Sequence, residues 1–214
     1  MHVTKFTHSC LRIDGDGDGA VLVVDPGAFS ERSALTGADA VLITHEHIDH
    51  LDPDALTDAL ARRPGLRVYA HADVLPKLAA FQGVVTAVEP GEQFEAAGFT
   101  IRAYGGMHAL IHSDIPRVAN LGYLISDGGT NLYHPGDSFT VPEDEAVERL
   151  FVPLNAPWAK LAESIDFVRA VKPERAFALH DALLTELGAG VYDATLGRLS
   201  GTAYAHVAPG TTID

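Results

Sequence analysis

Three histidines and an aspartate lie within six consecutive residues, directly after the apolar run 40–43. Imidazole and carboxylate groups are ligands that borderline-soft divalent metals accept. An extended backbone points the alternating His45 and His47 to the same side. Asp49 and His50 lie just beyond them, where they could serve a second ion beside the first. A polar loop before a helix does not explain so many histidines, so the segment predicts a metal site.

Three further candidate ligands come at or just after the ends of expected strands. They are His108, Asp137 and His180, and glycine or proline residues precede the first two. Glycine lets a side chain swing back over a sheet edge. Together with the histidine-rich segment they form a set of five histidines and two aspartates. This set is large enough for two ions.

The elements that must position these ligands can be placed from the hydrophobic pattern. Expected strands lie at residues 3–6, 11–13, 20–24, 40–43, 66–69, 84–88, 99–104, 121–126, 130–133, 149–152, 175–179 and 203–207. Expected helices lie at 54–63, 72–81, 159–171 and 191–199. Two β-rich parts thus alternate with two β/α parts. The order predicts two sheets packed face to face with helices outside, a four-layer αββα sandwich formed by one domain, 1–214.

The Gly/Asp-rich residues 14–19 resemble the opening of a calcium-binding loop. An EF-hand needs flanking helices, whereas strand-like segments flank this run. Glycine and aspartate are also common hairpin-turn residues, so we expect a solvated hairpin.

Composition restricts the classes of function. The chain has 214 residues, 47% hydrophobic content and a net charge of −14. This charge disfavours nucleic-acid binding, because no basic stripe neutralises phosphates. We expect a small-molecule substrate and no membrane association, since no apolar run is long enough to span a bilayer. The single Cys10 and the lack of a visible signal sequence indicate a cytoplasmic protein without an internal disulfide.

The His-x-His-x-Asp-His run at 45–50 resembles the motif of the metallo-β-lactamase-fold hydrolases. Asp25, in Val-Val-Asp-Pro-Gly, and the later single histidine, aspartate and histidine ligands extend the resemblance over nearly the whole chain. The segments Thr-His-Ser-Cys at 7–10 and Tyr-His-Pro-Gly-Asp-Ser at 133–138 are most similar to the subgroup that contains ascorbate-6-phosphate lactonase. The resemblance implies the αββα sandwich and a dinuclear metal centre.

The resemblance also implies how the ligands divide between two ions. Asp25 would support the ligand loop through hydrogen bonds, and His8 would lie beneath the metals as a supporting donor. The implied ligands are His45, His47 and His108 for one ion, Asp49, His50 and His180 for the other, and Asp137 between the two.

The implied activity is hydrolysis by a hydroxide held between two divalent ions, with Asp49 as the catalytic side chain that orients it. The ligand set suits zinc and also admits manganese, iron or nickel. The substrate would be a small ester, lactone, amide or phosphodiester, for which an anionic group is one option.

Two other functions compete with hydrolysis. One is an iron-dependent oxygenase or oxidoreductase on the same fold, which His47 disfavours because diiron relatives tend to have an acid there. The other is a non-catalytic, metal-stabilised binding protein. The roles of His112, His134, Trp158 and Lys160 are open between substrate contact and packing.

Overall fold

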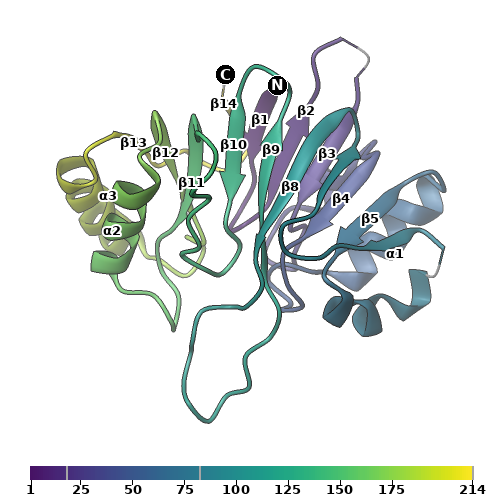
Figure 1. Cartoon of the computed structure of the whole chain (residues 1–214), viewed down its shortest axis with the longest axis horizontal. Coiled ribbons are helices and arrows are strands. Elements are labelled where there is room, and N and C mark those ends of the chain that lie inside the picture. The colour runs from purple at the N-terminus through teal and green to yellow at the C-terminus, as the bar shows by residue number, and fades with distance from the viewer. Residues whose placement is uncertain (18, 82, 214) are drawn as a thin grey trace.

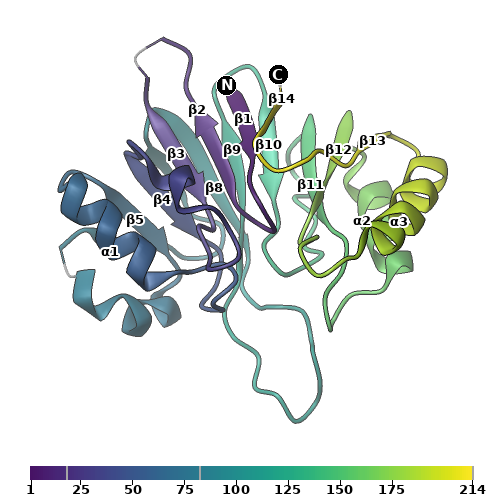
Figure 2. The ribbon, with the colours of Figure 1, turned by 180° about the vertical axis from the view of Figure 1, so that it is seen from behind.

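The computed structural model describes residues 1–17, 19–81 and 83–213. Two seven-stranded sheets face each other, and helices cover the outer face of each, as Figures 1 and 2 show from opposite sides. The predicted αββα sandwich is confirmed. Asp18, in the expected hairpin turn, lies outside the described residues, but the strands on either side of that turn pair antiparallel.

The first sheet has the strand order β14-β1-β2-β3-β4-β5-β6 and carries the histidine-rich segment. Its antiparallel part joins a parallel part that starts between β3 and β4. The strands are β1 (His2–Lys5), β2 (Leu11–Asp14), β3 (Val21–Val24), β4 (Ala40–Ile43), β5 (Arg67–Ala70), β6 (Val85–Ala87) and β14 (Thr211–Ile213). The helices on its outer face are η1 (Arg32–Leu35), α1 (Pro53–Arg62) and η2 (Ala72–Phe81).

The second sheet has the order β13-β12-β11-β10-β9-β8-β7 and supplies the remaining candidate ligands. Its strands are β7 (Gln93–Ala96), β8 (Phe99–Gly105), β9 (Leu121–Ser126), β10 (Asn131–His134), β11 (Arg149–Pro153), β12 (Arg175–Leu179) and β13 (Ala203–Ala205). Two helices, α2 (Leu161–Val171) and α3 (Glu186–Leu199), cover its outer face.

β4 shows why the sandwich forms. All four of its residues are buried. Side chains of alternate residues point to opposite faces of a sheet, and both faces of β4 are covered. Leu42 belongs to the core between the two sheets, whereas Val41 and Ile43 belong to the core under α1. A strand buried on both faces reads as a continuous apolar run, which is what residues 40–43 show.

Hydrogen bonds join the two sheets at the edge where the ligands emerge. The Tyr123 hydroxyl donates to the carbonyl of Ile43 at 2.9 Å, and the Leu121 backbone N–H donates to the carbonyl of Thr44 at 2.9 Å. The end of β4 is therefore held against the start of β9. This contact fixes the histidine-rich segment relative to the second sheet.

Three expectations from the hydrophobic pattern were incomplete. The short edge strands β7 and β14 were not predicted, because three or four residues carry little periodic signal. Residues 72–81 form kinked 3₁₀ turns, with Pro76 inside, where a regular helix was expected. α3 begins at Glu186, earlier than predicted, and the Thr185 hydroxyl caps it by accepting from the Gly188 N–H.

Among the described residues, every helix is too short or too polar to cross a bilayer.

Candidate metal centre

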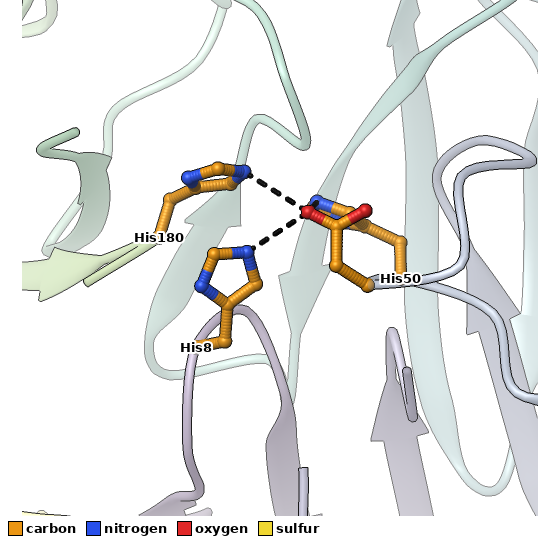
Figure 3. Close-up of side chains that lie close together, drawn as sticks. His8, His50 and His180 are labelled. Atoms are coloured by element: carbon orange, nitrogen blue, oxygen red, sulfur yellow. Dashed lines mark hydrogen bonds and ion pairs between the residues drawn. The ribbon is translucent and has the colours of Figure 1, made fainter. Parts of the chain in front are cut away.

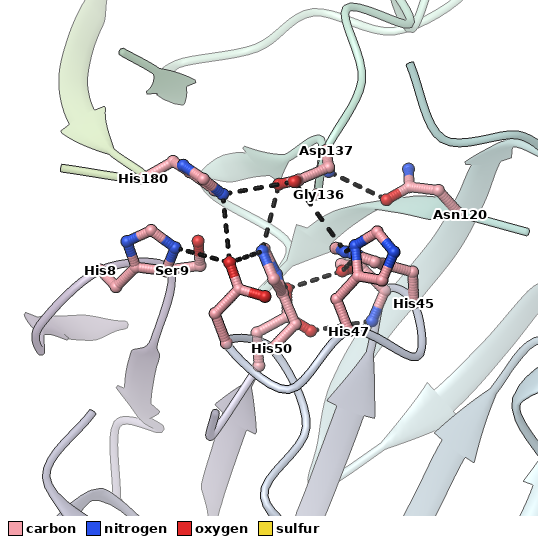
Figure 4. Close-up of polar contacts among 12 residues, drawn as sticks. His8, Ser9, His45, His47, His50, Asn120, Gly136, Asp137 and His180 are labelled. Carbon is pink, nitrogen blue, oxygen red and sulfur yellow. Dashed lines mark hydrogen bonds and ion pairs between the residues drawn. The ribbon is translucent and has the colours of Figure 1, made fainter. Parts of the chain in front are cut away.

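The histidine-rich segment forms a tight turn after β4. The backbone N–H groups of His50 and Leu51 both donate to the carbonyl of His47, at 3.0 and 2.9 Å. Asp52 then starts α1, because its side chain accepts from the N–H groups of the first helical turn. The turn places His45, His47 and His50 at the same end of the sheet (Figure 4), and Asp49 belongs to the same group of potential ligands as His50.

Asp25 holds this turn from below. Its fully buried carboxylate accepts from the Thr44 N–H at 2.8 Å, from the Thr44 hydroxyl at 2.7 Å and from His50 Nδ1 at 2.7 Å. The bond to Nδ1 assigns the ring proton to that nitrogen and leaves His50 Nε2 directed at the other candidate ligands. Asp25 occupies a left-handed conformation, with φ of 49°, which a non-glycine residue rarely adopts. Asp25 thus joins β3 to the start and the end of the histidine-rich turn.

Gly27 and Gly136 allow the backbone to come close to the ligand turns. A Cβ atom at Gly27 would overlap the backbone of Asp49, and one at Gly136 would overlap the side chains of Asn120 and Thr44. Gly136 also has a φ of 60°. Both sites therefore require glycine.

The second sheet and its loops deliver the other ligands with their rings already oriented. His108 Nδ1 donates to the carbonyl of Ala109 at 2.6 Å, and His180 Nδ1 donates to the carbonyl of Asn155 at 2.7 Å. Both rings therefore present Nε2 to the cluster. Asn120 holds the backbone of Asp137, because the Asn120 side-chain oxygen accepts from the Asp137 N–H at 2.9 Å.

These residues converge into two adjacent groups. Within each group the potential ligand atoms lie within 4.8 Å of one another. Figure 3 shows the side chains of His8, His50 and His180 around one carboxylate, and Figure 4 shows the wider cluster. The groups are His8, Asp49, His50 and His180, and His45, His47, His108 and Asp137. All seven predicted ligands are brought together, and His8 joins them.

Asp137 lies between the two groups. One carboxylate oxygen is 3.2 Å from both His108 Nε2 and His180 Nε2, and the other is 3.1 Å from His50 Nε2. Its carboxylate therefore touches members of both groups, which is the position that a bridging ligand requires.

The buried donor atoms fit a pair of cations. Nε2 of His50, His108 and His180 and Oδ1 of Asp137 are buried and make no hydrogen bond, in spite of their short separations. A buried polar atom without a partner costs about 1–3 kcal/mol. Four such atoms converging on one place, all of ligand type, are explained by divalent metal ions that accept their lone pairs.

The pKa values in the cluster follow from its charges. Burial lowers the pKa of His50, but the carboxylates of Asp137 and Asp25 outweigh it and hold the pKa well above the usual value. Burial also opposes the ionisation of Asp137, and the neighbouring imidazoles reverse this effect and lower its pKa. Burial also lowers the pKa of His180, but the carboxylates of Asp137 and Asp49 together outweigh burial and raise the pKa to about 9. The cluster attracts positive charge, and metal binding would release protons from these rings.

His8 contacts the cluster through Asp49. Its Nε2 is 3.0 Å from an Asp49 carboxylate oxygen, and its Nδ1 accepts from the Ala182 N–H at 3.4 Å. An Nδ1 that accepts requires the neutral ring to carry its proton on Nε2. His8 therefore donates to Asp49.

Trp158 and Asn120 belong to the site although the sequence did not identify them as such. The Trp158 indole N–H donates to Asp137 at 3.0 Å, and Asn120 orients the same residue. For Trp158 the available signal is a single tryptophan in a loop after a strand, which leaves substrate contact and packing open. For Asn120 there was no signal.

The three other residues whose roles the sequence leaves open, His112, His134 and Lys160, lie outside the two groups of potential ligands. His134 accepts from the Gly136 N–H and contacts the Ser9 carbonyl, so it holds the turn before Asp137. The exposed side chain of His112 lies beside Asp114. Lys160 precedes α2, where its backbone N–H donates to Glu163.

Comparison with known proteins identifies relatives over most of the chain. A family model described as a beta-lactamase superfamily domain matches residues 2–180. Protein Rv0786c of Mycobacterium tuberculosis is 39% identical over 208 residues, which cover 95% of each chain. A protein of Carboxydothermus hydrogenoformans named UPF0173 metal-dependent hydrolase is 25% identical over 228 residues, covering 100% of this chain and 99% of its own. Igni18, described as a metallo hydrolase from Ignicoccus hospitalis, has the same fold, with a TM-score of 0.76 at 20% identity over 99% of this chain and 97% of its own.

Proposed function

Because the chain belongs to the beta-lactamase superfamily, we propose that it is a dinuclear metal-dependent hydrolase of a small ester, lactone, amide or phosphodiester. A relative aligned over the whole chain is named a metal-dependent hydrolase. The observation that carries the proposal is the convergence of eight histidine and aspartate side chains into two adjacent groups. The buried ligand atoms without hydrogen bonds support it.

We assign the ligands by group. Asp137 would bridge the ions, since its carboxylate lies near histidines of both groups. His8 would orient Asp49 and would not bind metal, because its Nε2 carries the proton. The proposed ligands are His45, His47 and His108 for one ion, Asp49, His50 and His180 for the other, and Asp137 for both.

When bound, two divalent ions would polarise the scissile group and lower the pKa of a shared water towards about 7. The chain itself provides the base. The Asp49 side chain is 20% exposed and that of Asp137 only 4%, so Asp49 is the carboxylate that an attacking water can reach. Burial raises the pKa of Asp49, but the nearby imidazole of His180, 3.4 Å away, and the hydrogen bond from His8 outweigh burial and keep Asp49 ionised. Asp49 would orient the water and take its proton, while His8 holds the carboxylate in place.

The finer assignments are part of the same proposal. Zinc is the metal best matched by imidazole and carboxylate ligands, with manganese, iron or nickel as alternatives. The acidic net charge of −14 supports a small-molecule substrate and not a nucleic acid. The single buried Cys10 supports a reducing, cytoplasmic location.

The likeness to the subgroup containing ascorbate-6-phosphate lactonase is a further proposal. Both segments that suggested it, 7–10 and 133–138, contribute to the site through His8, His134 and Asp137. A lactone substrate is therefore the first to test.

The test combines metal content with turnover. His47→Ala and Asp137→Ala should each lose bound metal and hydrolysis of lactone, ester and phosphodiester substrates together, because each removes a ligand. His112→Ala, which changes an exposed histidine outside both groups, should keep both. Wild-type metal content and turnover in either ligand variant would refute the assignment.

A further inference from the structure

Exposed apolar side chains gather around the candidate metal centre. Of the nine large apolar residues that are exposed among the described residues, six lie beside residues of the candidate metal centre, in the chain or in space. Scattered exposed apolar residues are ordinary, but a gathering at one place indicates a binding surface. We call these six residues the apolar rim. They are Phe29, Ile48, Met107, Leu110, Ile115 and Leu183.

Four parts of the fold contribute to the rim, and three of them contribute one residue each. Ile48 lies between two candidate ligands and is 66% exposed, although its backbone is held by a bond from the Ala28 N–H. The Phe29 ring centroid is 5.2 Å from that of His8. Leu183 follows Ala182, whose N–H donates to His8. The turn after β4, the loop after β3 and the loop after β12 therefore each expose an apolar side chain near the centre.

The loop between β8 and β9 contributes the rest. It extends beyond the sandwich at the end where the ligands lie (Figure 1). Its base is fixed, because the His108 N–H donates to the Val118 carbonyl at 2.9 Å and the Ala109 N–H donates to the Asp137 carbonyl at 2.8 Å. Leu110 and Ile115 lie beyond this base and are exposed. A fixed base thus presents apolar side chains beside the ligands.

A narrow pocket connects this loop to the ligands. His47 and His108 form one side of it, and the loop side is formed by Ile111, Ile115, Pro116, Arg117 and Val118. All but one of these loop residues are apolar. A substrate group that enters beside the two imidazoles would therefore contact apolar side chains of the loop as well as the imidazoles.

The charged side chains on this side are of both signs and do not select an anion. Arg117 is the basic residue of the pocket, and its Nε is engaged, since it donates to the His108 carbonyl at 2.7 Å. An adjoining pocket lined by Arg117 and Met107 also contains the acidic side chains of Glu46 and Asp73. A negatively charged substituent would meet these carboxylates beyond the rim.

We propose that the apolar rim binds an uncharged alkyl, acyl or aryl substituent of the substrate, adjacent to the scissile bond. This rests on the proposed function, because the rim matters only if the substrate is held at the metal centre. It narrows the substrate class to neutral esters, lactones or amides with an apolar substituent. Anionic substrates would gain nothing from the rim.

The test uses hydroxamates, which share one metal-binding head and differ in their tails. Acetohydroxamate, hexanohydroxamate and the monohydroxamate of adipic acid are titrated into the zinc-loaded protein. Binding is read from the fluorescence of Trp158, the single tryptophan, whose indole bonds to Asp137. We expect hexanohydroxamate to bind at least tenfold more tightly than acetohydroxamate, since each buried methylene contributes up to about fourfold. The adipic compound, of equal length but charged, should show no such gain.

Matched variants locate the effect. Leu110→Asn and Ile115→Asn should each reduce the preference for the hexanoyl tail at least threefold, with zinc content unchanged. Leu199→Asn is the control: this exposed leucine ends α3, about 20 Å along the helix from the end near the rim. It should keep the wild-type preference.

Each contrary result has a distinct meaning. Equal binding of all three compounds, or tighter binding of the adipic compound, would overturn the apolar rim while leaving the metal centre intact. Absence of binding by every hydroxamate to protein with two bound zinc ions would also overturn it, because the substrate site would then not lie at the metals. Failure to take up zinc at all would refute the proposed function itself.

Discussion

Asp25→Asn provides a sharp test of how the chain prepares His50 for metal. The carboxylate accepts three hydrogen bonds, two from Thr44 and one from His50 Nδ1. An amide has one oxygen. If that oxygen keeps the bond to the Thr44 N–H, the NH₂ group faces His50 Nδ1. The ring must then accept at Nδ1 and carry its proton on Nε2, which blocks the atom that points into the cluster.

The magnitudes follow from these contacts. Loss of a supporting carboxylate of this kind costs about 10–100-fold in metal affinity. Loss of one hydrogen bond to a buried charged group costs about 1.5–3 kcal/mol of folding free energy. We therefore expect Asp25→Asn to fold, to unfold at lower urea concentration, and to bind zinc at one of the two proposed metal positions at least tenfold more weakly.

Competition with a chromophoric chelator measures the two zinc affinities, and urea unfolding of chelator-treated protein measures the loss of stability. Asp127→Asn is the matched control, because this carboxylate also accepts backbone N–H bonds but lies in the β9–β10 turn. It should lose some stability and keep both zinc affinities. Wild-type zinc binding by Asp25→Asn would refute the argument that Asp25 sets the proton position of His50.

Two further substitutions test other parts of the account. Gly27→Ala should lower zinc content and stability together, because the added Cβ would overlap the backbone of Asp49. Gly65→Ala is the control and should change neither, because a Cβ there meets nothing within 4 Å. Normal zinc content in Gly27→Ala would contradict the expected overlap. His206→Gln tests the pH dependence of stability. A hydrogen bond to Asp181 and the charge of Asp193 raise the pKa of His206 above its ordinary value of 6.5. The contribution of protonated His206 to the free energy of unfolding is therefore fully present below pH 6.5 and is lost as the pH rises through the raised pKa. Unfolding free energies of wild type and His206→Gln should therefore differ most near pH 6 and converge at high pH, and a gap that widens with pH would contradict this assignment.

Much of the site was predictable because its ligand types occur at the ends of strands. His108, Asp137 and His180 come from separate strands, and the strands of a sandwich bring such ends to a common edge. The apolar runs locate the strands, so the convergence of these side chains followed from local patterns. The four-layer order was predictable for the same reason.

The remaining features depend on contacts between distant segments. His8 is 174 positions from Ala182, whose N–H determines which nitrogen of the ring carries the proton. The bond from Trp158 to Asp137 depends on how the loop after β11 folds over the cluster. The edge strand β14 exists because β1 offers it a partner. No local pattern encodes such pairings.

The metal content of the protein tests the central claim most directly. The protein should be purified without chelators and its transition metals measured per chain by atomic spectrometry. Two equivalents per wild-type chain, and a loss of metal when His47 or Asp137 is replaced by alanine, are the predicted results. A folded wild-type protein that retains no transition metal, even after incubation with zinc or manganese, would contradict the account.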